Sequence, residues 1–194
     1  ALESGAELVR PATVREIKLQ SGGQHPVLAP VDGVEKTYKA RWVIDASGVA
    51  ALLARQEGWW RRNEAHPTAT IWSRWTGVKD WEGLELKKKF PQWAATCYGQ
   101  RGSATNHLMG RGWWAWWIPL KGGDVSIGAV FDQRILEIPE GGRPSERLKK
   151  FLMEHPVGAE LMRDAQPTEG DIHTRRNLAY YSTTFAGDGF ALVS

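Results

Sequence analysis

The alternation of side chains is clearest in the segment 112–120, which reads GWWAWWIPL. Successive side chains of a β-strand point to opposite faces of a sheet. A strand here would have aromatic residues on both faces: Trp113, Ala115 and Trp117 on one, and Trp114, Trp116 and Ile118 on the other. Pro119 would end the pairing, because it has no N–H to donate. We therefore predict a strand that lies between a core and either a second layer or a flat aromatic ligand.

Further strands are predicted in the middle of the chain. The segment 69–78 alternates like a strand, and 105–120 is predicted as one long strand with a kink at 110–112. The polar segment 121–124 predicts a turn, after which 125–131 returns antiparallel. These segments together predict a mostly antiparallel sheet.

The first third of the chain has a different pattern. Asp32-Gly33 within 27–38 is a strong hairpin signal. A compact apolar strand at 40–44 is followed by small residues and then by a short predicted helix at 49–56. This order of strand and helix is typical of an α/β domain that binds a cofactor.

The second half adds helices and a final strand. The segment 81–90 predicts a lysine-rich surface helix or loop. An apolar stripe predicts a helix from Ser145, with Ser145 as its N-cap and an interruption at Pro156. The segments 177–184 and 190–193 are strand-like.

These elements suggest how the chain is organised. We expect residues 1–57 to be part of a cofactor-binding domain and 58–185 to form a substrate domain with an antiparallel sheet. Residues 186–194 would return into the first domain. Both ends read as cut within elements, so we expect a central fragment of a longer protein.

Composition excludes several classes of protein. Of 194 residues, 42% are hydrophobic and 24% charged, which is ordinary for a globular chain, whereas 11 tryptophans are not. The net charge of +3 comes from scattered basic residues, which disfavours a nucleic-acid partner. The longest apolar run is too short to cross a membrane, and no signal peptide is visible, so we expect a cytoplasmic protein without a membrane partner.

Cysteine and histidine usage argues against structural metal or disulfides. The single cysteine, Cys97, cannot form an internal disulfide and is expected to be a small buried residue. The five histidines have no ligand-like spacing, so we predict no metal site.

The segment 41–48, RWVIDASG, is the first candidate for chemistry. Small residues at the carboxyl end of a strand let a cofactor approach the backbone, and a helix N-terminus beyond them favours anionic groups. The alternative is a plain turn between strand and helix, with Ser47 as a helix cap.

Three motifs resemble known flavoproteins. Gly5-Ala6-Glu7 with Val14, together with 41–48, resembles flavoproteins that have two dinucleotide-binding domains. The segment 114–119, WAWWIP, is similar to the W-x-W-x-I-P signature of flavin-dependent halogenases. The segment 187–194 resembles the strand that precedes the second flavin motif of that family, although Ser194 stands where the family usually has glycine.

The resemblance implies a hydroxylase-like FAD/NAD(P)-binding fold that combines α/β and antiparallel β structure, with FAD as the cofactor. It implies two sets of site residues. The cofactor-binding set is Asp45, Ala46, Ser47, Gly48 and Val14. The set that walls a channel toward the substrate is Trp114, Trp116, Ile118, Pro119 and His107.

In the family, a flavin hydroperoxide oxidises halide, and the product halogenates an aromatic substrate. An indole wall suits this chemistry because it excludes the water that would consume the oxidant. The partners implied are an aromatic small molecule, halide and a separate flavin reductase. The family's catalytic lysine would lie outside this chain, which by itself is expected to be inactive.

Alternatives stay open on the sequence alone. The protein could be a flavin monooxygenase or reductase of the same fold that does not halogenate. It could also be a tryptophan-rich carbohydrate-binding module, since exposed indoles stack on sugars. The indoles of 112–120 could simply fill a core, and His107 could be an ordinary structural histidine.

Overall fold

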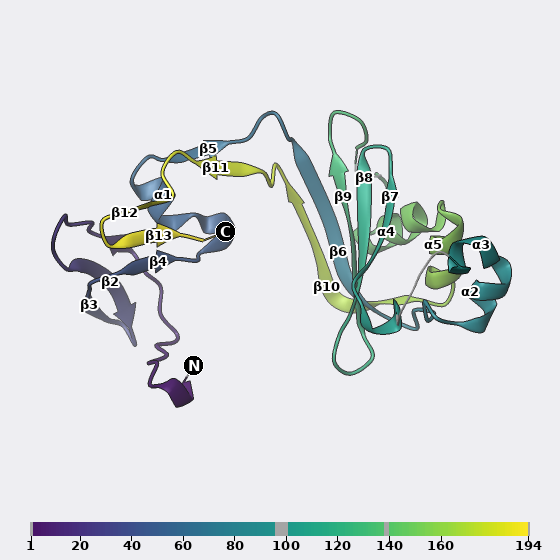
Figure 1. Cartoon of the computed structure of the whole chain (residues 1–194), viewed down its shortest axis with the longest axis horizontal. Coiled ribbons are helices and arrows are strands. Elements are labelled where there is room, and N and C mark those ends of the chain that lie inside the picture. Colours follow the sequence, from purple (N-terminus) through teal and green to yellow (C-terminus); the bar gives the residue numbers. More distant parts are fainter. Residues whose placement is uncertain (1, 96–100, 138–139, 194) are drawn as a thin grey trace. The chain divides into compact units, whose positions relative to one another are not determined.

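The computed structural model describes residues 2–95, 101–137 and 140–193 (Figure 1). Cys97 lies outside the described residues. The chain divides into two compact units, one formed by 1–62 with 180–194 and the other by 63–179. We call them unit 1 and unit 2.

The borders of the units differ from the predicted domain borders at 57 and 185. β5 (Trp60–Arg62) pairs antiparallel with β11 (Tyr180–Ser182). This ladder ties both short strands to unit 1, whereas the sequence prediction had assigned them to the substrate domain. Neither strand has an alternating apolar pattern that could have shown this.

Unit 1 contains a three-stranded antiparallel sheet of β1 (Glu16–Ile17), β2 (His25–Val31) and β3 (Val34–Ala40). Asp32 and Gly33 link β2 to β3 with φ angles of 50° and 78°. Both angles lie in the left-handed region that tight hairpins require. The hairpin predicted at this position is confirmed.

A second sheet of unit 1 carries the α/β character of the fold. Its order is β12 (Ala186–Gly187), β13 (Phe190–Leu192) and β4 (Val43–Asp45), with β13 parallel to β4. The predicted helix at 49–56 is a 3₁₀ turn, Gly48–Ala50, followed by α1 (Leu52–Gln56). The two pieces are separate because Ala51, between them, has a left-handed conformation.

The core of unit 1 is small. Ile17, Val43, Leu53 and Phe190 are buried together, so they join the first sheet, β4, α1 and β13. Trp59 packs against this cluster and stacks on Phe190, with ring centroids 5.3 Å apart. The carboxyl end of β4 is thus fixed by a core directly beneath it.

Unit 2 is built on a five-stranded antiparallel sheet with the order β10-β6-β9-β8-β7 (Figure 1). The strands are β6 (Thr68–Thr76), β7 (Asn106–Gly110), β8 (Trp113–Pro119), β9 (Val125–Asp132) and β10 (Gln166–Arg176). The predicted antiparallel sheet is confirmed, but β10, its longest strand, was not predicted.

The segment 105–120 is a hairpin, and the prediction of a single kinked strand was wrong. β7 pairs antiparallel with β8, and the chain reverses at Arg111 and Gly112. Gly112 has a φ of 78°, which other residues rarely adopt. A Cβ atom on Gly110 would lie 2.2 Å from Nε1 of Trp113, so the tight turn requires glycine there too.

Four helices belong to unit 2: α2 (Leu84–Lys89), α3 (Pro91–Ala95), α4 (Pro144–Met153) and α5 (Pro156–Met162). The break at Pro156 is confirmed. Ser145 is not the N-cap, because α4 begins one residue earlier, at Pro144. There the N–H of Arg143 donates to Glu146, and proline is well suited to the first position of a helix. A further 3₁₀ turn spans Arg101–Ser103 and another, in unit 1, spans Leu2–Ser4.

The inner face of the sheet is the core of unit 2. It holds Ala115 and Trp117, each with no exposed surface, and the apolar side chains of α4 and α5 pack against it. Trp113 meets Phe151 of α4 edge to face, with ring centroids 5.0 Å apart. The predicted division of β8 into two faces is therefore confirmed, with one face in the core. No helix in the described ranges is long and apolar enough to cross a membrane.

Candidate functional site

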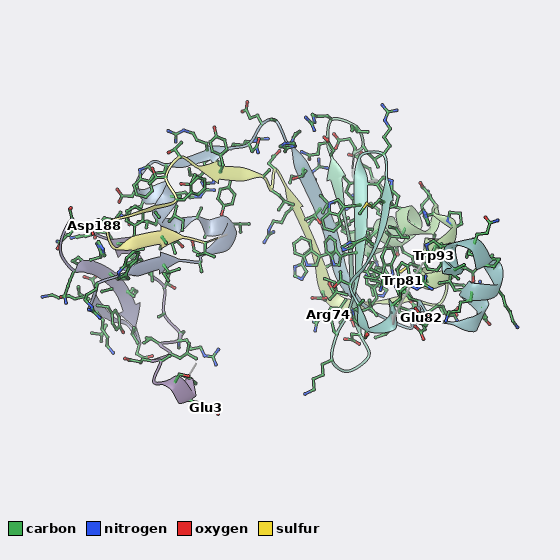
Figure 2. All side chains as sticks on the ribbon, viewed as in Figure 1. Glu3, Arg74, Trp81, Glu82, Trp93 and Asp188 are labelled. Atoms are coloured by element: carbon green, nitrogen blue, oxygen red, sulfur yellow. The ribbon has the colours of Figure 1, made fainter. Side chains whose placement is uncertain are left out.

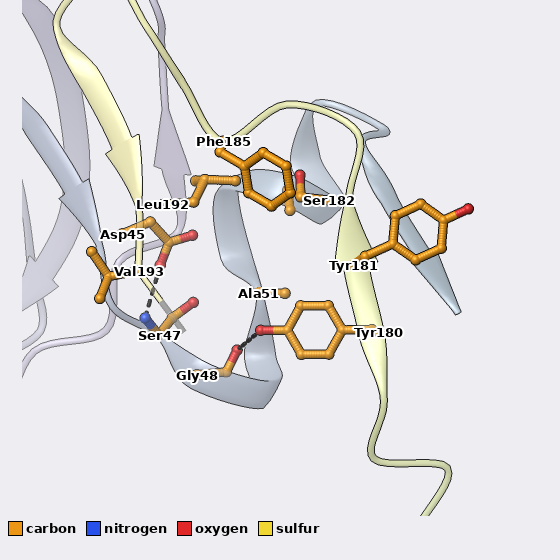
Figure 3. Close-up of a pocket in the computed structure, with 11 residues that line it drawn as sticks. Asp45, Ser47, Gly48, Ala51, Tyr180, Tyr181, Ser182, Phe185, Leu192 and Val193 are labelled. Carbon is orange, nitrogen blue, oxygen red and sulfur yellow. Dashed lines mark hydrogen bonds between the residues drawn. The ribbon is translucent and has the colours of Figure 1, made fainter. Parts of the chain in front are cut away.

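A pocket of about 130 Å³ lies in unit 1, at the carboxyl end of β4 (Figure 3). It is formed by the end of β4, the turn that follows, β11 and the end of β13. The residues that line it are Asp45, Ser47, Gly48, Ala51, Ala54, Tyr180, Tyr181, Ser182, Phe185, Leu192 and Val193. Carboxyl ends of parallel strands are where α/β folds bind their ligands, and this pocket has that position.

Asp45 organises the turn beside this pocket. Its Oδ1 accepts the N–H of Ser47 at 2.9 Å, and its Oδ2 accepts the N–H of Leu53 at 2.7 Å. Ser47 Oγ accepts the N–H of Leu52 at 2.9 Å. Partial burial opposes ionisation of Asp45, but the hydrogen bonds from Ser47 and Leu53 outweigh it and lower the pKa of the carboxyl group.

These hydrogen bonds occupy N–H groups at the N-terminus of α1, where the sequence had suggested an anionic group. The N–H groups of Leu52 and Leu53 are satisfied by Ser47 and Asp45, and α1 is only one turn and a half long. Ser47 thus accepts an N–H of the first turn of α1, as the alternative interpretation suggested, although the N-cap residue of α1 is Ala51. The two side chains shape the pocket wall, and an anionic group would have to be held elsewhere.

The other predicted cofactor residues lie at different places. Gly48 lines the pocket, has a φ of 59°, and a Cβ atom there would meet nothing within 4 Å. Ala46 is not among the lining residues. Val14 is 37% exposed and precedes β1, away from the pocket lining. The structure thus brings together three of the five predicted residues.

Aromatic residues of the last segment complete the pocket and were missed in the sequence. The Tyr180 hydroxyl donates to the carbonyl oxygen of Gly48 at 2.8 Å, which fixes the turn to β11. Phe185 is 64% exposed and lines the same pocket. Their signal was the YYSTTF sequence just before the glycine-rich turn, and its distance along the chain hid the contact.

The second candidate region is the outer face of the sheet in unit 2. His107 is the register partner of Trp116, and its ring lies 5.4 Å from that of Trp114 in an edge-to-face arrangement. The rings of Trp114 and Trp116 are 5.6 Å apart. Trp116 Nε1 donates to Ser126 Oγ at 3.3 Å. Three of the predicted wall residues therefore form one aromatic cluster.

The remaining two wall residues are separated by the pleat of β8. Ile118 lies on the outer face with the cluster and is 36% exposed. Pro119 shares the inner parity of Trp117 and lines a hollow beside Trp81 and the turn after β8. The proline of the motif thus belongs to the end of the core and not to the outer face.

Four residues of the outer face were missed in the sequence. Trp72 stacks on His173, with ring centroids 5.0 Å apart, and His173 Nε2 lies 3.2 Å from Asp171 Oδ1. Asp171 Oδ2 accepts the N–H of Arg74 at 2.7 Å and its Nε at 3.0 Å. The Arg74 guanidinium lowers the pKa of Asp171 to about 2. Trp72 carried a signal, since it alternates within a predicted strand, but β10 did not.

A third group of residues in unit 2 combines charged and aromatic side chains near α2 and α3, around Trp81, Glu82 and Trp93 (Figure 2). Arg101 donates to Glu82 Oε1 from Nε at 2.9 Å and from its backbone N–H at 3.0 Å. The Arg101 guanidinium lies 4.3 Å from the centre of the Trp93 ring. The hydrogen bonds from Lys87 and Arg101 lower the pKa of Glu82 to about 2. This arrangement holds α2 and α3 near the core.

No metal centre can be built from the described residues, among which no three His, Cys, Asp or Glu side chains gather suitably. Each unit thus contributes a candidate region of its own, the pocket in unit 1 and the aromatic face in unit 2.

Comparison of the sequence with known proteins gives one kind of relative. No protein-family model matches the chain. The tryptophan 2-halogenase of Chondromyces crocatus is 27% identical over 185 residues, which are 91% of this chain and 32% of that protein. The sulochrin halogenase of Aspergillus terreus is 28% identical over 169 residues, which are 84% of this chain and 28% of that protein. The chain thus spans about a third, or less, of the length of these relatives.

Comparison of the structure gives similar neighbours. The crystal structure of the halogenase PltM matches 99% of this chain and 38% of its own, with a TM-score of 0.77 and 22% identity. The myxobacterial chondrochloren halogenase CndH matches 99% of this chain and 41% of its own, with a TM-score of 0.74 and 20% identity. A flavoprotein/dehydrogenase from Cytophaga hutchinsonii matches 98% and 42%, with a TM-score of 0.73 and 20% identity.

Both comparisons agree with the fold described above. The structural neighbours have the flavoprotein fold of FAD-dependent halogenases, and unit 2 of this chain has an antiparallel sheet, so the predicted fold class is confirmed. The chain is similar in sequence to flavin-dependent halogenases, and it has the fold of FAD-dependent halogenases and related flavoproteins.

Proposed function

We propose that this chain is part of an FAD-dependent halogenase that replaces an aromatic C–H by a carbon–halogen bond. The observation that carries the proposal is the outer face of β8. The rings of Trp114 and Trp116 lie next to each other there, and His107 meets Trp114 edge to face. Both tryptophans belong to a W-x-W-x-I-P sequence. The relatives are named as halogenases, which favours this reaction over carbohydrate binding.

FAD is the proposed cofactor, and the unit 1 pocket fits one part of it. A pocket of about 130 Å³ is too small for the whole molecule but has room for a ring or a sugar. The open backbone at Gly48 permits close approach, and the Tyr180 and Phe185 rings offer flat apolar surface. Gly48, Tyr180 and Phe185 would hold the cofactor, while Asp45 and Ser47 keep the turn in shape. PltM, one of the neighbours, has been crystallised with FAD.

When reduced, FAD supplies the two electrons that let O₂ oxidise a halide ion. The overall reaction consumes an aromatic C–H, halide, O₂, two electrons and two protons, and gives the aryl halide, hydroxide and water. The oxidised halogen species is short-lived in water, so a site that excludes water raises the yield. Trp114 and Trp116 would provide that exclusion, and Ile118 extends the apolar surface.

The partners follow from this reaction. The proposed substrate is an aromatic small molecule, which agrees with a relative named for tryptophan and with the neighbour crystallised with phloroglucinol. Halide is the second substrate, and a separate flavin reductase would deliver the electrons. We place the protein in the cytoplasm, where reduced nicotinamide for such a reductase is at hand. The catalytic lysine of the family would come from residues beyond these 194.

The test is an assay of the full-length gene product with FAD, a flavin reductase, NADH and O₂. Chloride and bromide are supplied in separate reactions, with a panel of phenols and indoles. Mass spectrometry identifies aryl halides by their isotope pattern, and a reaction without halide is the control. We expect halogenated product that appears only with halide.

Hydroxylated product in every reaction would overturn halogenation and make the protein a flavin monooxygenase. NADH oxidation that the protein catalyses with FAD in the absence of the added reductase, with neither product formed, would favour a reductase. Failure to bind FAD, measured by fluorescence titration of the full-length protein, would contradict FAD as the cofactor. It would overturn both the halogenase and the monooxygenase.

A further inference from the structure

Trp72 lies on the outer face of the sheet in unit 2, on β6, the second strand from the β10 edge. The strand register places one residue from each strand in a single row: His173, Trp72, Gly128, Trp116 and His107. Four of these five residues carry aromatic rings, and the exception is glycine. The row therefore continues the pair of Trp114 and Trp116 across the sheet, beyond the W-x-W-x-I-P strand.

Trp72 and Trp116 meet above Gly128. A Cβ atom at position 128 would lie 2.4 Å from Cζ2 of Trp116 and 2.5 Å from Cβ of Trp72. Contacts this short do not occur, so the space above Gly128 belongs to the two tryptophans. A displacement of Trp72 therefore changes the surroundings of Trp116 directly.

Trp72 is itself held from the other side. His173 stacks on it with an interplanar angle of 26°, and Asp171 Oδ1 holds Nε2 of that histidine. The other carboxylate oxygen of Asp171 is fixed by two N–H groups of Arg74. Asp171 follows Gly170, whose φ is 71°, within the register shift of β10. The irregular part of β10 thus places a braced carboxylate at the end of the aromatic row.

We propose that Trp72 is a third ring of the aromatic wall and that Asp171 is its positioning residue. Asp171 contacts His173, and His173 stacks on Trp72. Trp72 and Trp116 both border the space above Gly128, and the ring of Trp116 lies beside that of Trp114. Asp171 keeps the His173 ring parallel to Trp72, and Trp72 keeps Trp116 in its place over Gly128. The consequence for catalysis, a wall that excludes water, rests on the proposed function.

The first experiment tests the positioning without any reaction. The full-length protein is labelled with 5-fluorotryptophan, and ¹⁹F resonances are assigned with Trp72→Phe and Trp116→Phe. In Asp171→Asn, which removes the charge but keeps an acceptor for Arg74, we expect the resonances of both tryptophans to move. Glu137→Gln is the matched control. Glu137, like Asp171, pairs with an arginine of the sheet, in this case Arg176 of β10, but it contacts no ring in any interaction described.

Each outcome decides the proposal. Movement of both resonances in Asp171→Asn, with neither moving in Glu137→Gln, supports it. A shift of Trp72 alone, or of neither, overturns the claim that Asp171 positions Trp116. If Asp171→Asn does not fold, His173→Gln removes the stacking ring and leaves the pair of Asp171 and Arg74, and the same two resonances are read.

The second experiment reads the consequence in turnover. In Asp171→Asn we expect aryl halide per flavin oxidised to fall several-fold, with more peroxide released and the rate of flavin reduction unchanged. An unchanged ratio beside moved resonances would overturn Trp72 as part of the wall. If the wild-type protein makes no aryl halide while the ¹⁹F result holds, the proposed function fails and the positioning by Asp171 stands.

Discussion

Trp116 lies across the backbone of Gly128 on the next strand, so closely that a Cβ atom there would come within 2.4 Å of its ring. The observed orientation of the Trp116 ring therefore requires glycine at position 128. Trp116 Nε1 reaches Ser126 Oγ, two residues before Gly128, which fixes the ring along the same strand. The flat aromatic surface of β8 is thus made as much by β9 as by the tryptophans themselves.

We predict that Gly128→Val displaces Trp116 and destabilises unit 2. Overpacking of this kind costs about 1–3 kcal/mol of the free energy of unfolding. Urea unfolding measures the loss, and the ¹⁹F resonance of Trp116 reports the displacement. Val130→Ile, on the same face of β9 but not under Trp116, is the control. Equal stability of both variants and wild type would contradict the prediction.

The two faces of β8 could be predicted because strand geometry alone decides them. Every second residue points the same way, so Trp117 had to share a face with Ala115, and Trp114 with Trp116. The hairpin at Asp32-Gly33 was predictable for a similar reason, since its two residues tolerate left-handed angles. In both places the signal is local and does not depend on distant contacts.

β10 could not be predicted because its pattern is broken. Gly170 and the register shift between Pro167 and Ile172 interrupt the alternation, and the following residues are mostly polar and exposed. The reversal at Gly112 was taken for a kink, although the core-facing parity changes there, from Leu108 in β7 to its register partner Ala115 in β8.

The candidate site was predictable only in part, for the same reason. Asp45, Ser47 and Gly48 adjoin one another in the sequence, and the structure places them on one pocket. Tyr180 comes from a strand more than a hundred residues away, and only its hydrogen bond to Gly48 shows that it belongs there. Contacts across such separations depend on the fold, which local patterns do not contain.

We predict that Trp116→Phe in the full-length protein keeps the fold and flavin reduction but lowers aryl halide per flavin oxidised. Phenylalanine fills less of the space above Gly128 and cannot donate to Ser126, so water reaches the oxidant more easily. Product and peroxide are measured in the same reaction. Trp42→Phe, an exposed tryptophan of unit 1, controls for the loss of an indole as such. An unchanged product ratio would mean that Trp116 does not exclude water.

We predict that Asp45→Ala destabilises unit 1 by about 1–2 kcal/mol, the usual cost of removing a helix cap. The side chain accepts hydrogen bonds from the N–H groups of Ser47 and Leu53. α1 has only five residues, so it depends on these bonds for its stability. Glu35→Ala, an exposed carboxylate on β3, is the control and should cost far less. Chemical denaturation followed by circular dichroism gives both values, and similar losses would contradict the capping role.

The lowered pKa of Asp45 also predicts how the stability of unit 1 changes with pH. Because the folded pKa of Asp45 is lowered from 3.8, its contribution to stability is complete above that value. It is lost as the pH falls through the folded pKa. Asp45→Asn should therefore lose less stability than wild type as the pH falls below 3.8 and through the folded pKa, which urea unfolding at a series of pH values measures.

The last prediction compares Glu82 with Asp132, two carboxyl groups whose pKa values are both lowered to about 2. Lys87 and Arg101 lower the pKa of Glu82, and Arg134 lowers that of Asp132. Below the unfolded pKa values, 4.5 and 3.8, stability should fall with pH as each group takes up a proton, and above them the contribution is complete.

At neutral pH, however, the two neutral variants should differ. Glu82→Gln leaves the guanidinium of Arg101, which is 8% exposed, without its counter-charge, whereas Asp132→Asn leaves Arg134, which is exposed to water. A buried charge without a partner is strongly destabilising, and an exposed one is not. We therefore expect a clearly lower melting temperature for Glu82→Gln and little change for Asp132→Asn, measured by scanning calorimetry at pH 7. Equal melting temperatures would mean that water reaches Arg101 as freely as Arg134.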